Sequence, residues 1–205
     1  MGATADLPFS CTCGRFKAIL HDVGPDEGDR LTCYCADCRD FVRVIGRADL
    51  LDANGGNAVY QTRVAKLEIL EGADVLATLH MTEKPTMRWY ASCCNTPLFN
   101  TLPKAKPPFL SVNTSAFDQA RVAAALGPSK GDFLAQEAEP PLAHPRTVSK
   151  FKLALGFFPR LFKDLFSGDW RKSPLFDPAS LEPMAKPRRV SQEERKAGSL
   201  LQASP

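Results

Sequence analysis

The hexapeptide CYCADC (33–38) holds three cysteines in six positions, far more than core packing requires. Residues i and i+2 of an extended strand point to the same side, so Cys33 and Cys35 can direct both sulfurs toward one ion. The two-residue step that follows has the length of a tight turn, which would fold the sulfur of Cys38 back toward the others. The hexapeptide alone therefore predicts three corners of a tetrahedral metal site.

Two further stretches, CTCG and SCCNTP, contain the remaining four cysteines of the chain. Cys11 and Cys13 repeat the C-x-C spacing, and Gly14 lets the backbone turn away. This pair needs two more ligands, and Cys93 and Cys94 are the cysteines left. A division into four and three predicts one closed, structural site and one site with an open position for water or substrate.

Composition and length set the context for these thiols. The chain has 205 residues, with 44% hydrophobic and 24% charged side chains, as expected for a globular domain with an appendage. No run of apolar residues is long enough to span a membrane, and the first ten residues lack the pattern of a secretory signal. We therefore expect a cytoplasmic protein, in which reduced cysteines bind metal more often than they form disulfides. A redox switch and small buried side chains are the alternatives.

The chain from residue 9 to about 110 is typical of strands and turns, so we expect a mainly β fold. A turn at Glu71 and Gly72 would let two of the strands continue as a meander. A short helix at 118–127, with Gly127 as its stop, follows them. The predicted strands lie at residues 15–20, 30–35, 59–70, 75–83, 86–94 and 109–117.

The composition changes in the last third of the chain, where a Pro-rich connector leads into an apolar and basic segment. Residues 150–205 hold 11 Lys and Arg against 6 Asp and Glu, whereas the net charge of the whole chain is only +3, too small to suggest a nucleic-acid partner. The expected division is a zinc-binding β domain at 8–130, a connector with an amphipathic helical extension at 131–181, and a poorly ordered tail at 182–205.

The helical extension, at 146–166, is interrupted by Gly156 and Pro159, which favours a pair of helices docked on the β domain. The alternative is an arm, at 150–166, that contacts a membrane surface or another protein. The apolar residues that recur at three- and four-residue spacing are Phe151, Leu155, Phe158, Leu161, Phe162 and Leu165, and the basic ones are Lys150, Arg160 and Lys163.

The motifs CTCG, CYCADCRD and CCNTPLFN, in that order, resemble those of the family of glutathione-dependent formaldehyde-activating enzymes and centromere protein V (the GFA-like family). That family carries C-x-C-G, C-x-C-x-x-C-R and C-x-x-C-G-[ST], and the resemblance covers roughly residues 8–115. The closing motif departs from the pattern, because Ala91 stands where its first cysteine belongs. Cys93 can substitute for it only if the backbone bends, and Asn95, in place of Gly, tolerates the positive φ of a turn.

The resemblance implies a small β-tent fold with two zinc ions. Cys11, Cys13 and Cys94, with Cys93 as the uncertain fourth ligand, match the structural site. Cys33, Cys35 and Cys38 match the catalytic zinc site, whose open position accepts the sulfur of glutathione. The implied activity is that of a carbon–sulfur lyase acting on adducts of glutathione, or a similar thiol, with small aldehydes such as formaldehyde.

Other side chains near the motifs have weaker signals. Asp37 and Arg39 flank Cys38 and are expected to form a solvated surface pair, with support of the metal ligands as the alternative. Tyr34 either covers the metal or packs on the domain, and His80 is expected to be an ordinary strand histidine rather than a ligand. The rival to the enzyme hypothesis is a non-catalytic, zinc-stabilised interaction module that uses its basic C-terminal tail.

Overall fold

The computed structural model describes residues 4–200, and within them the chain is mainly β with four α-helices. The strands are β1 (Ala5–Ser10), β2 (Lys17–Val23), β3 (Asp29–Cys33), β4 (Asn57–Arg63), β5 (Leu67–Glu71), β6 (Leu76–His80), β7 (Met87–Ala91), β8 (Thr96–Thr101), β9 (Phe109–Asn113), β10 (Asp132–Phe133), β11 (Thr147–Val148) and β12 (Arg188–Arg189). The α-helices are α1 (Ala36–Val44), α2 (Gln119–Leu126), α3 (Lys150–Ser167) and α4 (Gln192–Leu200). Short 3₁₀ turns are η1 (Ala48–Leu50), η2 (Val64–Lys66), η3 (Ala73–Val75), η4 (Thr114–Ala116), η5 (Ala135–Glu137) and η6 (Asp169–Lys172).

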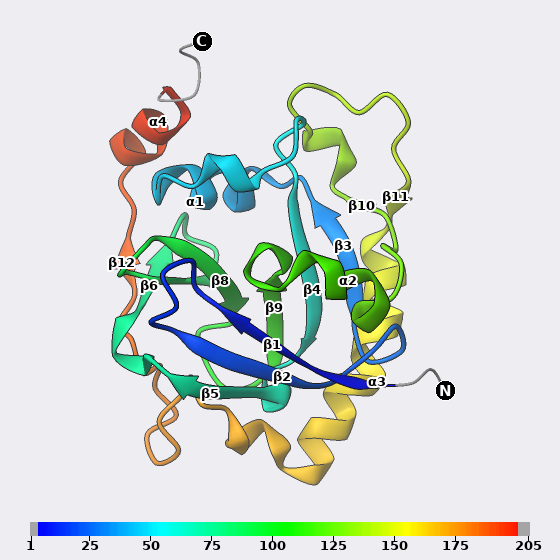
Figure 1. Ribbon diagram of the computed structural model, residues 1–205, viewed down its shortest axis with the longest axis vertical. Coiled ribbons are helices and arrows are strands. Elements are labelled where there is room, and N and C mark those ends of the chain that lie inside the picture. Colours follow the sequence, from blue (N-terminus) through cyan, green and yellow to red (C-terminus); the bar gives the residue numbers. More distant parts are fainter. Residues whose placement is uncertain (1–3, 201–205) are drawn as a thin grey trace.

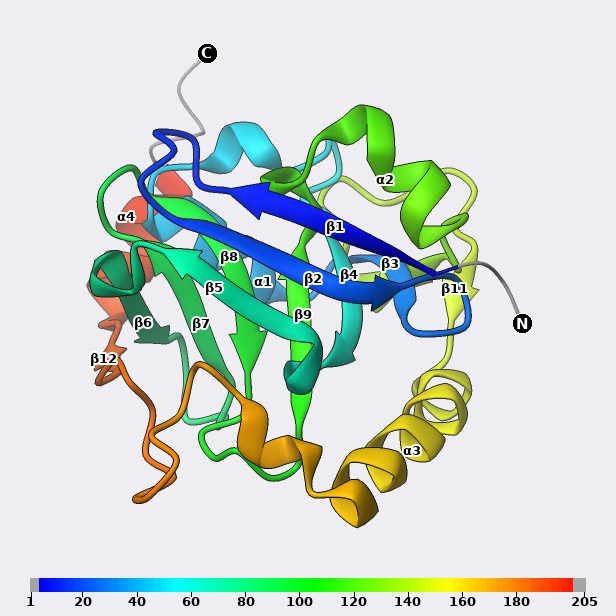
Figure 2. The same cartoon turned by 60° about the horizontal axis from the view of Figure 1, so that its bottom comes forward.

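Nine strands form one mixed sheet in the order β11-β10-β3-β4-β9-β8-β7-β6-β12, and β1, β2 and β5 form a second, antiparallel sheet. The small sheet lies across the middle of the large one (Figure 1; Figure 2). Side chains alternate along β4, so Tyr60 joins the core between the two sheets, while Val59 joins Leu153 in a cluster on the opposite face. Among the largest buried side chains of the core between the sheets are Phe16, Trp89, Phe99 and Leu110.

The mainly β prediction is confirmed, but the predicted meander is wrong. The stretch 59–70 is broken at η2, and β5 leaves the large sheet to pair with β2, with Leu67 opposite Leu20. Leu67 is buried in the core between the sheets, whereas the next strand, β6, pairs with β7. Leu67 thus belongs to the small sheet and contributes to the core, a change of sheet that the alternation within the stretch does not show.

Two local predictions around helices have different outcomes. The helix predicted at 118–127 is α2, where the Asp118 carboxylate accepts from the Ala120 N–H at 3.1 Å and Gly127 ends the helix with φ +76°. The tight turn predicted after Cys35 is instead the start of a nine-residue helix, α1. Phe41 is fully buried on its inner face, which explains why the chain continues as a helix.

The predicted pair of helices is one continuous helix, α3, with Pro159 inside it. The side chains that fix α3 to the large sheet are charged: Arg160 pairs with Asp29 of β3, and Asp164 pairs with Arg63 of β4. Arg160 and Asp164 are one helical turn apart, directly after the proline. Their ion pairs therefore fix this part of the helix to the sheet. Among the described residues, no helix is long and apolar enough to cross a membrane.

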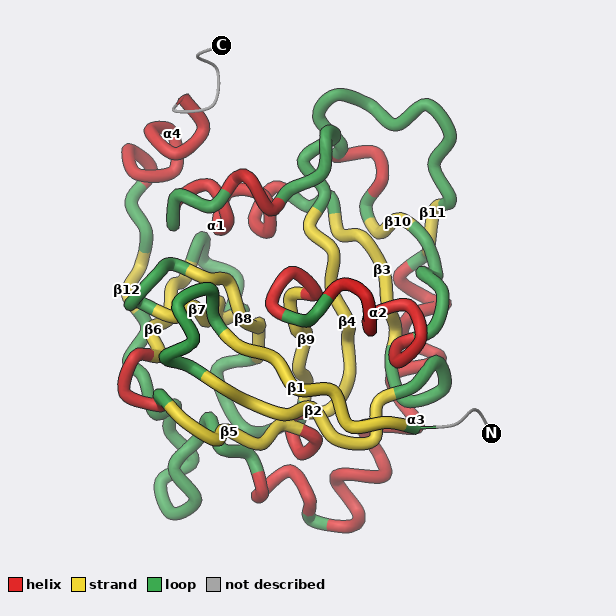
Figure 3. The backbone as a smooth tube through the Cα atoms, in the orientation of Figure 1, coloured by secondary structure: helices red, strands yellow, loops and turns green. Residues whose placement is uncertain are grey.

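The segments after residue 130 complete the large sheet. β10 pairs in parallel with β3 and β11, so the predicted connector belongs to the β structure. The tail from 182, predicted to be poorly ordered, instead follows a defined course to residue 200: β12 pairs with β6, and α4 packs on α1 (Figure 3). Arg195 of α4 pairs with Asp40 of α1, which gives this polar segment its anchor. Residues 201–205 lie outside the described part.

Candidate metal centres

The cysteine trio, Cys33, Cys35 and Cys38, lies where β3 ends and α1 begins. Cys33 is the last residue of the strand, Cys35 is the N-cap of the helix, and Cys38 follows in its first turn, where its N–H donates to the Cys35 carbonyl at 3.0 Å. The sulfurs of Cys33 and Cys35 are 3.4 Å apart, and all three lie within 4.8 Å of one another. Thiolates around a tetrahedral zinc ion are separated by about 3.8 Å, because each Zn–S bond is about 2.3 Å long.

A buried arginine contacts the trio from behind. Arg88 of β7 donates from Nη1 to Cys38 Sγ at 3.4 Å and to Asn100 Oδ1 at 3.3 Å. Hydrogen bonds from Cys33 and Cys35, together with the Arg88 guanidinium, hold the pKa of Cys38 well below its ordinary value. The amino end of α1 also favours negative charge at this position. The favoured thiolate is that of Cys38, because hydrogen bonds among the three sulfurs and burial raise the pKa of Cys33 well above its ordinary value and that of Cys35 to about 12.

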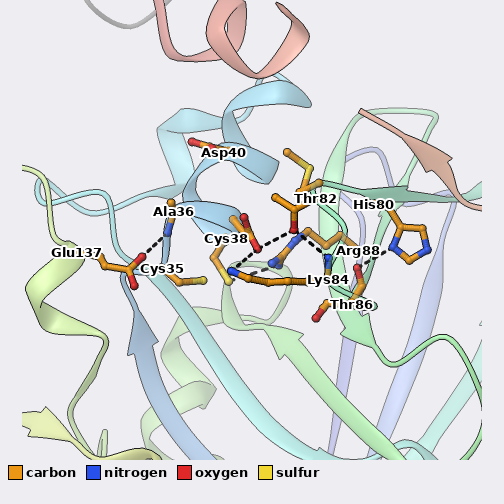
Figure 4. A network of polar contacts seen from close by, with 12 residues as sticks. Cys35, Ala36, Cys38, Asp40, His80, Thr82, Lys84, Thr86, Arg88 and Glu137 are labelled. Carbon is orange, nitrogen blue, oxygen red and sulfur yellow. Dashed lines mark hydrogen bonds and ion pairs between the residues drawn. The ribbon is translucent and has the colours of Figure 1, made fainter. Parts of the chain in front are cut away.

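The accessible edge of the trio carries one cation and one carboxylate, seen on opposite sides of Cys35 in Figure 4. Lys84 Nζ is 3.1 Å from Asp37 Oδ2, and the Thr82 hydroxyl donates to the same oxygen at 3.3 Å. The Asp37 carboxylate, with smaller contributions from Cys35 and Glu137, raises the pKa of Lys84. Glu137 accepts from the Ala36 N–H at 3.0 Å, at the first turn of α1. Because Cys35 is the partly exposed member of the trio, a ligand from solvent would meet this edge first.

The cysteine quartet comes from two turns at one end of the sheets. Cys11 and Cys13 follow β1, and Cys93 and Cys94 form the turn between β7 and β8. The sulfur of Cys93 is 3.8 Å from that of Cys11 and 3.3 Å from that of Cys13, and Cys94 Sγ is 3.8 Å from Cys93 Sγ. Asn95 has φ +55°, so the turn bends as the sequence requires for adjacent cysteines to meet one site.

Polar contacts within the quartet give Cys93 and Cys94 different pKa values. Burial raises the pKa of Cys94, but the hydrogen bond from the Thr96 hydroxyl and contacts with Cys13 and Cys11 prevail and lower it to about 6. Burial and hydrogen bonds to the other sulfurs raise the pKa of Cys93 to about 12. The two neighbours in sequence therefore differ strongly in their tendency to lose a proton.

Both groups fit a soft divalent ion, because every donor is sulfur and the separations are those of ligands sharing one centre. The quartet supplies four donors and can close a tetrahedron by itself. The trio supplies three, and no further His, Cys, Asp or Glu within residues 4–200 joins it. Each group could hold a metal ion, and only the trio leaves a position for a ligand from outside.

The prediction of a solvated surface pair beside Cys38 is wrong. Asp37 and Arg39 are both buried, and they bind different partners. Arg39 donates from Nη1 to the backbone carbonyls of Tyr34 and Glu137, at 3.3 and 2.8 Å, which ties η5 to the start of α1. Asp37 instead holds Lys84 over the trio, so it acts on the site through that side chain.

Two further predicted residues lie away from the metal ligands. The buried Tyr34 donates its hydroxyl to Asp52 Oδ2 at 2.8 Å, so it packs on the domain. His80 lies at the end of β6, where its Nδ1 is 3.2 Å from the Thr86 carbonyl oxygen, and it joins neither cysteine group.

The sequence interpretation missed Arg88, Lys84 and Glu137. A signal for Arg88 was present, since a charged residue in the otherwise apolar stretch TMRWYA needs a buried partner. Lys84 in a polar turn and Glu137 in a Pro-rich segment carry no local signal. Only the tertiary structure brings them to the edge of the trio.

Comparison with known proteins gives a family without a described activity. A search of curated proteins finds no match. A crystal structure of a Rhodobacter sphaeroides protein, a structural genomics target, is 17% identical and has a TM-score of 0.40, covering 55% of this chain and 89% of that one. Residues 4–186 match a family described as being of unknown function (DUF6151), and the chain belongs to that family.

Proposed function

We propose that this protein is a zinc-dependent carbon–sulfur lyase of the glutathione-dependent formaldehyde-activating type, with a β-tent fold of the GFA-like kind. In this proposal the quartet holds a structural zinc and the trio holds the reactive one. The observation that carries the proposal is the trio: three sulfurs converge one donor short of a tetrahedron, with Cys35 at an accessible edge. Metal-bound thiolates are typical of reducing compartments, so the proposal includes a cytoplasmic location.

The proposed reaction cleaves the adduct of a thiol with a small aldehyde, or forms it in reverse. Cleavage of an S-hydroxymethyl adduct breaks the C–S bond and returns its electron pair to sulfur, while the hydroxyl loses its proton and becomes the carbonyl of formaldehyde. Cys33, Cys35 and Cys38 would hold the zinc ion, which would supply a position at which a thiol sulfur binds as the thiolate. The protein has to orient the adduct and move the hydroxyl proton.

The side chains at the edge of the trio suit these two tasks. Lys84 is an exposed ammonium held by Asp37, so it can attract a carboxylate of glutathione or a similar acidic thiol. Glu137 is a carboxylate on the other side of Cys35 and can accept the proton. Arg88, behind the trio, offsets the negative charge of Cys38, and its role is to position that sulfur.

Metal analysis and a turnover assay test the proposal together. Purified, reduced protein should contain close to two zinc ions per chain, one for each group. Glutathione and formaldehyde should react faster with the protein than without it. Cys35→Ser should lose one zinc and all turnover, whereas Lys84→Met should keep both ions and show a raised KM for glutathione.

The other outcomes distinguish the rival hypothesis. Two zinc ions without turnover of any thiol adduct would favour a zinc-stabilised interaction module. Less than one zinc per chain would contradict both hypotheses. An unchanged KM in the Lys84→Met variant would contradict the proposed contact between Lys84 and the thiol, but it would not contradict the metal site.

A further inference from the structure

One face of α3 exposes a row of large apolar side chains, the phenylalanine stripe: Phe151, Leu155, Phe158, Phe162 and Phe166. They recur every three or four residues, and their exposed fractions run from 48 to 87%. The rings of Phe158, Phe162 and Phe166 stack in sequence, with centroids 6.3 Å apart. A continuous apolar surface of this kind marks an interaction site more often than an accident of packing.

The orientation of the helix is fixed, so the stripe does not turn inward. Arg160 pairs with Asp29 and Asp164 pairs with Arg63, and all four side chains are buried. Leu153 adds an apolar contact on the same inner face. Rotating α3 to bury the stripe would break both ion pairs and leave charges without partners, which is strongly unfavourable.

The charges that α3 exposes are all positive. Lys150, Lys152 and Lys163 are exposed, whereas the one acidic residue of the helix, Asp164, is buried. Phenylalanine flanked by lysine is the composition of helices that lie in the interface of an anionic bilayer, with the rings among the lipids and the ammonium groups at the phosphates. The basic excess of residues 150–205 adds to the same attraction.

A second copy of the chain fits the stripe less well. Antiparallel pairing of two α3 helices would bring Lys152 of one near Lys163 of the other, without an exposed acid on either helix to face them. Like charges in such a contact oppose association. An anionic lipid surface would attract these lysines instead of repelling them. Charge complementarity therefore favours a membrane as the partner of the stripe.

We propose that α3 docks the protein reversibly on an anionic membrane surface, with the phenylalanine stripe inserted among the lipid headgroups. This function is separate from that of the trio, because the stripe lies on the exposed face of α3, whereas Leu153 on the inner face joins the buried cluster that contains Cys33 and Cys38. Because the inner face of α3 is fixed to the large sheet, the helix lies in the plane of the membrane surface. The rest of the molecule stays on the aqueous side.

Vesicle flotation of the full chain tests this inference. Vesicles of phosphatidylcholine with roughly one quarter phosphatidylserine should carry the protein, and phosphatidylcholine alone should carry much less. Phe158→Glu combined with Phe162→Glu should weaken binding about tenfold or more, because two rings that would insert into the bilayer are replaced by charges that repel its anionic surface. Lys152→Gln combined with Lys163→Gln should weaken binding only to the anionic vesicles.

A matched control uses Leu70 of β5, which is 50% exposed, as is Phe162, but lies on another part of the surface. Leu70→Glu should bind like the unmodified protein, and circular dichroism and metal content should be unchanged in every variant. No binding to either vesicle, or equal binding by the phenylalanine variant, would overturn the inference. Sedimentation that shows a dimer which the phenylalanine variant dissociates, without vesicle binding, would assign the stripe to a second copy. Turnover of thiol adducts is measured separately, so either proposal can fail alone.

Discussion

The two cysteine groups differ in how the chain builds them. The trio comes from one hexapeptide at a junction of strand and helix, is largely buried, and has Arg88 and a helix terminus beside it. The quartet joins turns about eighty residues apart, and two of its members, Cys13 and Cys93, are exposed. The exposed group is complete and the buried group lacks one donor. If each group holds a metal ion, the buried group is therefore the one with a position left for a ligand, although the exposed group has the more accessible sulfurs.

The two groups should contribute differently to stability, which is the largest effect we expect. Cys11→Ser should lower the free energy of unfolding by about 3–5 kcal/mol, because an ion at the quartet closes a long loop between β1 and β8. Cys35→Ser should cost only about 1–2 kcal/mol, since the trio crosslinks six residues. Denaturant unfolding of both variants, with metal analysis, measures this contrast. Equal losses would show that both sites are structural.

Arginines near the two groups should also differ in how much they contribute to metal retention. Arg88 is buried and donates to a sulfur, whereas Arg47 lies beside the quartet and donates to the Thr12 hydroxyl at 3.2 Å. Arg88→Met should weaken retention of the trio's metal against a chelator by about 10–100-fold, as loss of a group supporting a ligand typically does. Arg47→Met should change retention by less than about fivefold. The contrast fails if the two variants release metal at similar chelator concentrations.

The smallest effect concerns the order in which thiols react after a chelator removes the metal. Cys94 has a pKa of about 6, so it is mostly thiolate at pH 7, whereas Cys93, with a pKa of about 12, stays protonated. Since the thiolate is the nucleophile, iodoacetamide should label Cys94 first, with a rate that rises through pH 6. Mass spectrometry of peptides measures the order. Faster labelling of the more exposed Cys93 would contradict it.

The grouping of cysteines could be predicted because it depends on local spacing and on counting. The strand period placed Cys33 and Cys35 on one side, and Asn95 indicated the bend that brings Cys93 to the quartet. Arg88 could not be placed, because its position behind Cys38 depends on how β7 and α1 pack against each other, and the two residues are 50 positions apart in sequence. The same holds for Leu67, because the pairing of β5 with β2 in the small sheet depends on tertiary structure.

The helical extension illustrates a different limit. Its apolar spacing predicted an apolar face, and four of the six predicted residues lie on the exposed stripe, whereas Leu165 packs against the core. An apolar face of this kind ordinarily packs inward. The structure reverses this, because Asp29 and Arg63 on the sheet provide partners for Arg160 and Asp164 on the helix. A charged residue is buried only where an oppositely charged partner lies opposite it. The sequence pattern of one helix does not show where such partners lie on the sheet.

The pairing of β10 beside β3 has a consequence for how the protein is made. The carbonyl of Phe133 accepts from the Tyr34 N–H at 3.0 Å, and Glu137 binds Ala36 across 101 residues of sequence. At a synthesis rate of roughly 5–20 residues per second, these partners leave the ribosome about 5–20 s after the hexapeptide. During that interval β3 can pair with β4 on one side only, so the side of the hexapeptide that β10 later covers stays open to solvent.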